Sequence, residues 1–414
     1  MPSESPTAMT DPAALSIDGF TPSRIAEPED PGDVAGILAE AAANGDAVAP
    51  VGGATSLALG NLPERLDVGL STARLRGVID YQPTDLTLSV AAGSPLAEVQ
   101  AILAEHGQTL PIEVPHPERA TIGGLIATAI AGPRRYGAGS LRDLLIGISA
   151  AHPSGTVTKA GGLVVKNVTG FDLMRLYLGS LGTLGIVVSA NFKVLPLPRH
   201  EATLHAIFPD LSPALDAANR LRTSRVQPVS LEVARADTDS WLLAARIEGR
   251  EATVRLLTTE ARDLVGSDGS VLEARASSDW WRSYVADQAI ATATGEALIR
   301  CTSKPSVTAA MVSGALNATS EEVSVKSAMI SPGLGALLLR VAIGSPDPVP
   351  CFSRFREALF GVADHVVVLA ADPVLKRDLD VWGRTPETID VMRAIKQQFD
   401  PFRVLNPGRF AGRL

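Results

Sequence analysis

Three glycine-rich segments in the first half of the chain constrain the fold more than any other feature of the sequence. They are residues 50–60 (PVGGATSLALG), 113–137 (EVPHPERATIGGLIATAIAGPRRYG) and 161–188 (GGLVVKNVTGFDLMRLYLGSLGTLGIVV). Each lies next to a short apolar run that predicts a strand. Because glycine is unfavourable inside helices and strands, its repeated use here indicates backbone that lies close to another chain segment or to a ligand.

The first segment has the composition of an anion-binding loop. Gly52 and Gly53 let backbone N–H groups turn toward one point, and Thr55 and Ser56 add hydroxyl donors. An ordinary turn after a strand explains the same residues. The segment is not a Walker loop, since no Gly-Lys-Ser/Thr follows, and it is not a G-x-G-x-x-G fingerprint.

The second segment combines small side chains with two cations. Gly123 and Gly124 precede an Ala-rich stretch where a flat ligand can lie against backbone N–H groups, although a tightly packed core helix explains the same pattern. Arg134 and Arg135 follow in a loop bounded by Gly and Pro. A cation at this place can stabilise an anionic cofactor or a substrate carboxylate, and at least one of the two is expected to be a solvated loop charge.

Composition excludes several classes of protein. The chain has 414 residues, of which 46% are hydrophobic and 20% charged, and its net charge of −8 without a basic tract argues against a nucleic-acid partner. Cys301 and Cys351 are the only cysteines, so thiolate metal sites and iron–sulfur clusters are excluded within the chain, and we expect both thiols to be reduced and buried.

Targeting and membrane signals are weak in the printed sequence. Its first residues lack the basic and apolar regions of a signal peptide, and the most apolar window, residues 122–132, is too short to span a bilayer. We therefore expect a cytoplasmic protein that contacts the inner face of the membrane only peripherally, through a partner.

The periodicity of apolar residues predicts two regions with different orders of helices and strands, with a boundary near Pro198. Before it, helices are expected at residues 33–44 and 95–107. Strands are expected before it at residues 47–51, 66–70, 77–81, 86–92, 144–151, 156–159 and 184–195. After it, the order β-α-β-β-α occurs over residues 201–265 and a similar order, β-α-β-β-α-β, over 296–370, which predicts an antiparallel sheet covered by helices on one face. The expected fold class is α+β.

In order and spacing, the three glycine-rich segments resemble those of vanillyl-alcohol-oxidase/PCMH-type FAD-binding flavoproteins. Within that family, the chain is similar to the FAD-binding subunits of bacterial glycolate oxidases. The motifs that carry the resemblance are GGATSL at 52–57, ATIGGLIATAIAGPRRYGAGSLRDLLIG at 120–147, GGLVVKNVTGFDLMRLYLGSLGTLGIV at 161–187, VWGR at 381–384 and FDPFRVLNPGRFAG at 399–412. The resemblance covers residues 25–200 and the C-terminal forty residues, whereas the middle of the chain is similar only in architecture.

The resemblance implies a PCMH-type FAD-binding domain of two subdomains at residues 25–200 and an α+β cap domain at 201–372. A mobile tail is expected at residues 1–24, and residues 373–414 are expected to return to the FAD domain. The implied cofactor is FAD, bound non-covalently because no Cys or His lies in the 52–60 loop. By family analogy, the residues that hold it are Val51, Gly52, Gly53, Ala54, Thr55, Ser56, Thr121, Ile122, Gly123, Gly124, Thr128, Gly132, Tyr136, Gly137, Gly185, Ile186, Val187, Asn406 and Arg409.

The resemblance also implies partners, namely a related catalytic flavoprotein subunit and an iron–sulfur subunit that passes electrons to quinone. Relatives that oxidise 2-hydroxy acids carry a His-Gly-Asp-Gly-Asn-type motif, whereas the six histidines here form no i, i+2 or i, i+4 pair. No metal site is expected, no base is visible, and the catalytic candidates are Arg134, Arg135 and Tyr136.

Three interpretations follow from this pattern. The chain is an electron-transferring FAD subunit of a glycolate oxidase complex, a free-standing dehydrogenase of hydroxy acids or alcohols, or a structural subunit with a vestigial FAD site. The missing histidine motif argues against the second, and the intact glycine loops argue against the third. The sequence leaves open whether glycolate, D-lactate or another 2-hydroxy acid is the substrate.

Overall fold

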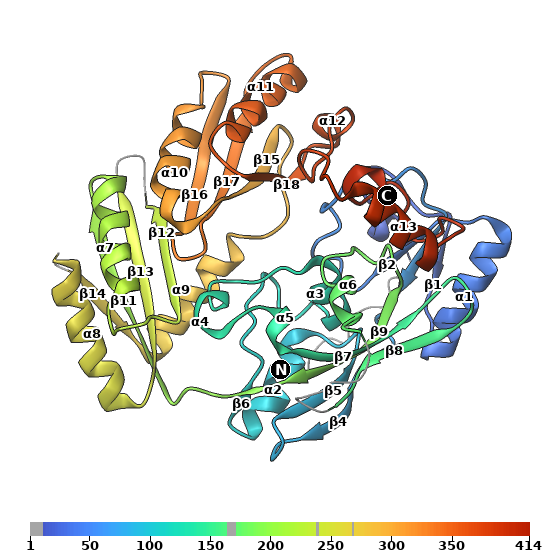
Figure 1. The fold of residues 1–414 in the computed structure, drawn as a ribbon, viewed down its shortest axis with the longest axis horizontal. Coiled ribbons are helices and arrows are strands. Elements are labelled where there is room, and N and C mark those ends of the chain that lie inside the picture. Colours follow the sequence, from blue (N-terminus) through green and yellow to red (C-terminus); the bar gives the residue numbers. More distant parts are fainter. Residues whose placement is uncertain (1–10, 164–170, 237–239, 267–268) are drawn as a thin grey trace.

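The computed structural model describes residues 11–163, 171–236, 240–266 and 269–414, which form a mixed α+β fold (Figure 1). A small parallel sheet has the strand order β1-β3-β2. Its elements are β1 (Arg24–Ala26), β2 (Val48–Val51) and β3 (Val68–Ser71), with helix α1 (Pro31–Asn44) between β1 and β2. Val34, Leu38 and Ala41 of α1 pack with Val48 and Leu70 of this sheet, which explains the helical spacing of the apolar residues.

A second, antiparallel sheet lies beside the first and has the order β4-β5-β9-β7-β8. Its strands are β4 (Val78–Gln82), β5 (Thr87–Ala91), β7 (Leu145–Ala151), β8 (Val157–Gly161) and β9 (Ile186–Lys193). Helices α2 (Leu96–Glu105) and α3 (Ile122–Thr128) contribute to its core. The short elements of this region are β6 (Gln108–Thr109), α4 (Arg135–Ala138), α5 (Leu141–Leu144), α6 (Met174–Tyr177) and β10 (Leu195–Pro196). The predicted strands of the first region are confirmed.

The remaining strands form an eight-stranded sheet, here called the cap sheet, with the order β14-β11-β13-β12-β16-β17-β15-β18. Its strands are β11 (His200–Phe208), β12 (Ser230–Arg235), β13 (Trp241–Gly249), β14 (Ser270–Glu273), β15 (Glu296–Thr302), β16 (Val323–Ser331), β17 (Ala336–Ile343) and β18 (His365–Ala371). All paired neighbours in it are antiparallel. This confirms the antiparallel sheet expected from the repeated order of elements.

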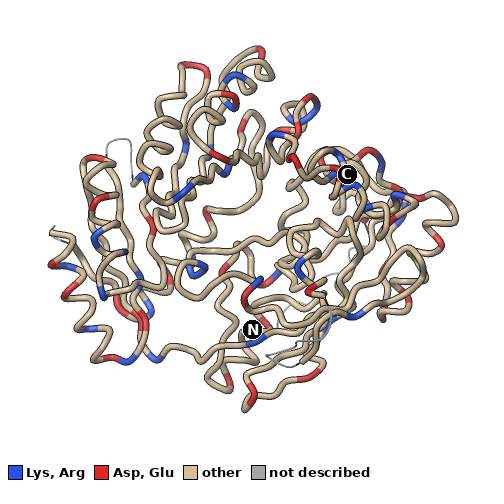
Figure 2. The backbone as a smooth tube through the Cα atoms, viewed as in Figure 1, with Lys and Arg blue, Asp and Glu red and all other residues tan. Residues whose placement is uncertain are grey.

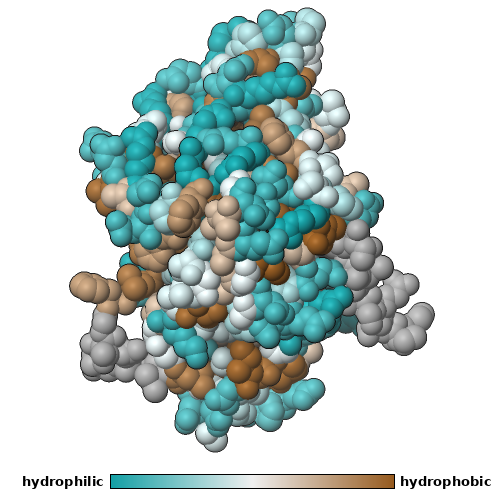
Figure 3. Space-filling view, turned by 90° about the vertical axis from the view of Figure 1, so that its right-hand side faces the viewer, coloured by the Kyte–Doolittle hydropathy of each residue, from teal (hydrophilic) through white to brown (hydrophobic). Residues whose placement is uncertain are grey.

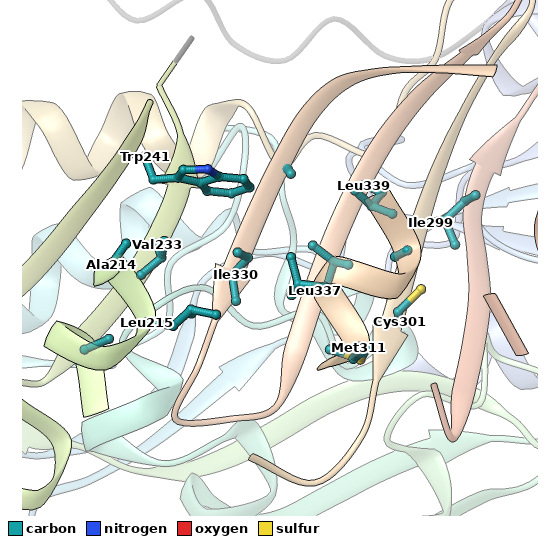
Figure 4. Packing of buried hydrophobic residues seen from close by; sticks show 14 of the residues in the cluster. Ala214, Leu215, Val233, Trp241, Ile299, Cys301, Met311, Ile330, Leu337 and Leu339 are labelled. Atoms are coloured by element: carbon teal, nitrogen blue, oxygen red, sulfur yellow. The ribbon is translucent and has the colours of Figure 1, made fainter. Parts of the chain in front are cut away.

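Helices cover both faces of the cap sheet, which corrects the expectation of a single covered face. The outer face carries α7 (Leu211–Thr223), α8 (Glu251–Val265), α10 (Thr308–Asn317) and α11 (Pro348–Phe360), whose apolar residues pack with the strand residues shown in Figure 4. Helix α9 (Ala274–Ala286) packs instead with Ala244 and Met329, whose strand neighbours face the outer core. We call the side that carries α9 the inner face of the cap sheet.

Aromatic residues of α9 fill the inner face. Trp281 is 1% exposed, and its Nε1 donates a hydrogen bond to Thr203 Oγ1 at 2.7 Å. Trp280 stacks on Tyr284 with ring centroids 5.1 Å apart. These contacts make the Trp280–Trp281 pair part of the packing beneath the sheet.

The N-terminal tail is ordered over its described part, so the expectation of a mobile tail over residues 1–24 is wrong for residues 11–24. Leu15 and Ile17 are each 1% exposed, and Leu15 belongs to the short helix η1 (Pro12–Leu15). Asp18 accepts a hydrogen bond at 2.8 Å from the buried Lys376 of α12 (Pro373–Lys376). Burial of these apolar side chains and this ion pair fixes the segment, while residues 1–10 lie outside the described ranges.

The C-terminal segment contains α13 (Ile389–Phe399) and returns to the two smaller sheets (Figure 1). Val48 N donates to Val404 O at 2.7 Å, and Asn406 N donates to Val48 O at 3.0 Å, so the segment pairs with strand β2. The short helix η3 (Ala411–Arg413) follows. Residues distant in sequence therefore meet beside the first glycine-rich segment.

Charges of both signs are distributed over the whole backbone (Figure 2). On the face shown in Figure 3, hydrophobic residues lie in separate patches among hydrophilic ones. Within the described ranges, none of the helices combines the length and hydropathy that are needed to cross a lipid bilayer. Both cysteines are buried and free, as expected.

Candidate functional site

The glycine-rich segments and the C-terminal segment surround one cavity, whose empty space together with the adjoining open solvent is about 1060 Å³. Among the residues proposed from the sequence, those that line it are Val51, Gly52, Gly53, Ala54, Thr55, Ser56, Thr121, Gly123, Gly124, Thr128, Gly185, Ile186, Val187, Asn406 and Arg409. We call this space the first cavity.

Two glycines hold the first loop against the second. A Cβ atom on Gly52 would lie 2.0 Å from Thr121 Oγ1, and one on Gly53 would lie 1.7 Å from the carbonyl oxygen of Arg119. Both distances are far below van der Waals contact, so only glycine permits this approach. The glycine pair is thus required by the packing that forms the cavity wall, whether or not its N–H groups also bind an anion.

The C-terminal segment closes the first cavity. Asn406 Nδ2 donates to Leu181 O at 2.6 Å, and Arg409 donates from Nη2 to Leu57 O at 2.8 Å and to Leu59 O. Burial lowers the pKa of Arg409 to about 10. Its buried Nε has no hydrogen-bond partner among the described residues, so the wall keeps an unsatisfied donor.

A buried ion pair fixes this segment. Lys396 Nζ donates to Asp400 Oδ2 at 2.6 Å, to Leu405 O at 2.9 Å and to Thr183 O at 2.8 Å. The Asp400 carboxylate accepts from the backbone N–H groups of Val404 and Leu405, both at 2.9 Å. The turn before Asn406 is therefore built on one buried carboxylate and its ammonium partner.

A second cavity of about 910 Å³ adjoins the first and lies against the inner face of the cap sheet. Both cavities are lined by Leu59, Thr128, Ile130, Gln288 and Ile290. Apolar residues of the cap, among them Met329, Leu338 and Leu369, form much of the wall of the second cavity. The charged residues that line it are Arg135, Glu232 and Arg300.

Neither arginine of the second cavity has a hydrogen bond or an ion pair with another described residue. Arg300 is mostly buried on β15, and its burial, followed by the positive charge of Arg135, lowers its pKa. Arg135 lies at the start of α4 and is exposed. The cavity thus contains two positive charges without a compensating carboxylate in contact.

Glu232 is the one carboxyl group among the residues that line the second cavity. Ser331 Oγ donates to its two carboxylate oxygens at 2.8 and 2.9 Å, and Tyr284 Oη donates to Oε2 at 3.0 Å. The residue is 2% exposed, and burial raises its pKa to about 8. The carboxyl group is therefore poised to gain or lose a proton near neutral pH.

Two segments of the chain match known families of FAD-linked proteins. Residues 22–161 match the family described as "FAD binding domain", and residues 375–410 match "FAD linked oxidases, C-terminal domain". The chain therefore contains an FAD-binding domain and a segment of the FAD-linked oxidase C-terminal domain, and its cofactor is FAD. The two matches fall on the segments that surround the first cavity, so we call it the flavin cavity from here on.

Two relatives of the chain carry names that refer to the oxidation of hydroxy acids. Glycolate oxidase subunit GlcE of Escherichia coli is 37% identical over 195 residues, which are 47% of this chain and 53% of that protein. D-2-hydroxyglutarate dehydrogenase of Xanthomonas citri pv. viticola is 27% identical over 450 residues, 97% of this chain and 93% of that protein. The match to the first relative thus spans about half the length of each protein.

A solved structure of similar fold is the xylooligosaccharide oxidase of Myceliophthora thermophila, with a TM-score of 0.70 at 17% identity. The match covers 97% of this chain and 94% of that one. At this identity the likeness concerns the fold alone. It confirms the fold class predicted from the sequence.

Several residues proposed from the sequence lie outside the flavin cavity. Ile122 is buried beneath it in the core around α3, and Gly132 lines the second cavity. Tyr136 packs against Gly333 in the turn between β16 and β17, and Gly137 lies against Val229. Tyr136 and Gly137 line neither cavity, so the proposed contact of these two residues with the isoalloxazine has no support in this geometry.

Arg134, a catalytic candidate, is engaged in an ion-pair network between the second glycine-rich segment and the cap sheet. Its guanidinium lies 2.5 Å from Glu248, 3.2 Å from Glu201 and 3.7 Å from Glu113. Arg246 of β13 also pairs with Glu113, at 2.7 Å. Burial lowers the pKa of Arg134, but the three carboxylates outweigh this effect and raise it. Arg134 thus joins the two parts of the chain, and Arg135 is the arginine among the catalytic candidates that lines the second cavity.

Sequence analysis missed Glu232, Gln288 and Arg300. Glu232 stands between Leu231 and Val233, and Arg300 stands between Ile299 and Cys301, all four of which are core residues. An isolated charge within an apolar strand was the available signal. The alternation of apolar and charged residues along these two strands indicates that Glu232 and Arg300 lie on the face opposite the core. It does not indicate which other segments of the chain contact that face.

Proposed function

We propose that the chain is the FAD-binding subunit of a 2-hydroxy acid oxidase complex of the glycolate oxidase kind. The 195-residue match to GlcE supports this proposal, as does the cationic second cavity beside the flavin cavity. FAD, when bound, supplies the acceptor for a hydride and passes electrons on one at a time. In the proposed complex these electrons leave through an iron–sulfur subunit toward quinone, and a related flavoprotein subunit completes the assembly at the inner face of the membrane.

The residues that would hold FAD are those of the flavin cavity. Residues 52–56 would bind the pyrophosphate, Thr121 and Thr128 would face the ribityl chain and ring, and residues 185–187 would contact the adenosine half. The unsatisfied Nε of Arg409 and the wall of small residues fit a large polar cofactor. No Cys or His is among the described residues that line the cavity, which supports non-covalent binding.

A self-sufficient dehydrogenase is the second candidate. The observation that favours it is the presence of Arg135, Arg300 and Glu232 in one cavity beside the flavin cavity. Oxidation of a hydroxy acid needs a cation for the carboxylate and a base for the hydroxyl proton, and these residues are of the right types. The two candidates differ in whether substrate electrons reach the flavin of this chain without a partner.

Glycolate addition under anaerobic conditions separates the candidates. We expect the purified chain to carry flavin absorbance and to remain oxidised with glycolate alone, and to be reduced once the complex is reconstituted. The measurement is the visible spectrum before and after addition. Complete bleaching by glycolate alone would instead establish a self-sufficient dehydrogenase, and failure to bind added FAD would contradict both candidates.

A further inference from the structure

Two cations hold the backbone at the end of the first glycine-rich segment, residues 57–60. Arg409 donates to the first and third carbonyl groups of this stretch. Lys376 of α12 donates from Nζ to the second and the fourth, at 2.6 and 3.4 Å, and its side chain is completely buried. Four consecutive carbonyl groups are thus bonded alternately to an arginine and a lysine, and both cations come from the C-terminal segment.

The partner of Lys376 comes from the other end of the chain. Its Nζ donates to Asp18 Oδ2 at 2.8 Å, and the Asp18 side chain is 6% exposed. Asp18 and Gly19 have φ values of +51° and +90°, and Ile17 and Phe20 exchange two backbone hydrogen bonds at 2.8 and 2.9 Å. Positive φ at both central residues is typical of a tight type I′ turn, and Asp-Gly suits it well. We call residues 17–20 the N-terminal turn.

The N-terminal turn is anchored beside the wall of the flavin cavity. Just before it, Leu15 packs against Gly69 of β3, where an added Cβ atom would lie 2.8 Å from Leu15 Cδ1. A third cavity lies between the turn and the first glycine-rich segment and is lined by Asp18, Ala54, Thr55, Leu57 and Ala58. Three of these residues also line the flavin cavity, namely Ala54, Thr55 and Leu57. The turn is therefore separated from the flavin cavity by a single loop.

Asp18 is the counter-ion of both cations. Burial is the main cause that lowers the pKa of Lys376 and of Arg409, and the charge of Asp18 opposes this effect at each of them. Arg409 in turn lowers the pKa of Lys376, because the two like charges repel each other. Asp18 thus favours the charged form of both side chains, and charged donors make the stronger hydrogen bonds to carbonyl groups.

We propose that Lys376 and Asp18 are positioning residues of the flavin site, through which the N-terminal turn holds residues 57–60 in the geometry that binds FAD. Neither side chain is among the described residues that line the flavin cavity, so both act through the backbone of the loop. The inference rests on the proposed placement of FAD in that cavity. If FAD binds the held loop better than the released loop, bound FAD must also stabilise the turn.

A double variant, Lys376→Met with Asp18→Asn, separates positioning from stability. Asp18→Asn alone leaves a buried ammonium without its counter-ion, so the double variant should melt closer to the wild type than this single variant does. Its FAD dissociation constant should nevertheless rise by about tenfold or more, because two carbonyl groups of the loop have lost their donor. The measurements are thermal melting and fluorescence titration of the flavin-free proteins with FAD. Wild-type FAD affinity in the double variant would overturn the proposal.

Asp11→Asn is the matched control, since it makes the same substitution in the same segment. Asp11 is exposed and accepts a hydrogen bond from Ala13 N at 2.9 Å at the start of η1. Its FAD affinity should equal that of the wild type. A loss as large as that of the double variant would show that the effect is not specific to the buried pair, and would also overturn the proposal.

Amide hydrogen exchange tests the coupling in the wild-type chain, where no substitution can disturb folding. Exchange at Ile17 and Phe20 should slow by about tenfold or more when FAD binds, and the double variant should lack this protection. Equal rates with and without FAD in the wild type would refute the coupling. If the chain took up no FAD, the placement of the cofactor would fail. Faster exchange at Leu59 and Asn61 in the flavin-free double variant would then still support the hold of Lys376 on the loop, and unchanged exchange would refute it.

Discussion

Asp400→Ala is expected to lower the free energy of unfolding by about 3–5 kcal/mol, because it leaves the buried Lys396 ammonium without its counter-ion. The substitution also removes the acceptor for the N–H groups of Val404 and Leu405. The turn that presents Asn406 should then open, and flavin content should fall together with stability. Urea denaturation and the flavin-to-protein absorbance ratio measure the two effects.

Asp390→Ala is the control on the same helix. Asp390 pairs with Arg393 at 2.9 Å, but its side chain is 87% exposed, so the pair contributes little and the urea midpoint should not change. A double variant, Lys396→Met with Asp400→Leu, removes both charges and should regain part of the lost stability. If Asp400→Ala unfolded at the same urea concentration as Asp390→Ala, the structural role of the buried pair would be disproved.

Gly53→Ala is expected to weaken FAD binding by roughly tenfold or more, since overpacking at a site without room costs about 1–3 kcal/mol. The added Cβ would lie 1.7 Å from the carbonyl oxygen of Arg119, which belongs to backbone and cannot turn away as a side chain could. The loop must therefore move off the second glycine-rich segment and take Thr55 and Ser56 out of the cavity wall. Titration of the flavin-free protein with FAD, followed by fluorescence, measures the change.

Gly36→Ala is the matched control for this substitution. Gly36 lies within α1, and a Cβ added there meets nothing within 4 Å. Alanine should stabilise the helix by about 0.5–1 kcal/mol and leave FAD affinity unchanged. Wild-type FAD affinity in Gly53→Ala would show that the two segments are free to separate, contrary to the packing described above.

The helices and strands were predictable because their signals are local. The helix expected at residues 33–44 ends at Gly45, which adopts the left-handed conformation, and the strands expected at 144–151 and 156–159 pair as β7 and β8. The flavin loops were also predictable, since close backbone contact demands glycine and glycine is visible in a sequence. The prediction that these loops meet the C-terminal segment, which is more than 200 residues away in sequence, rested on the family resemblance. No local sequence pattern indicates such a contact.

The inner face of the cap sheet was not predictable from the strand pattern. Arg246 and Glu248 alternate with apolar residues of β13, which normally marks a face toward water. Here the face is covered by α9 and by the second glycine-rich segment, and its Arg246 and Glu248 form ion pairs with Glu113 and Arg134 from the other part of the chain. The second cavity and its residues Glu232 and Arg300 arise at this interface, so they required the tertiary structure.

The distribution of the cavity wall along the chain has a consequence for the order of events in the cell. The wall begins at residue 50 and is completed by Arg409, whose guanidinium donates to the carbonyl groups of Leu57 and Leu59. During synthesis, more than 350 residues must therefore be added after Leu57 before its carbonyl group can accept this hydrogen bond. We expect cofactor loading to follow release of these residues from the ribosome, so that a nascent chain halted before Arg409 does not retain FAD.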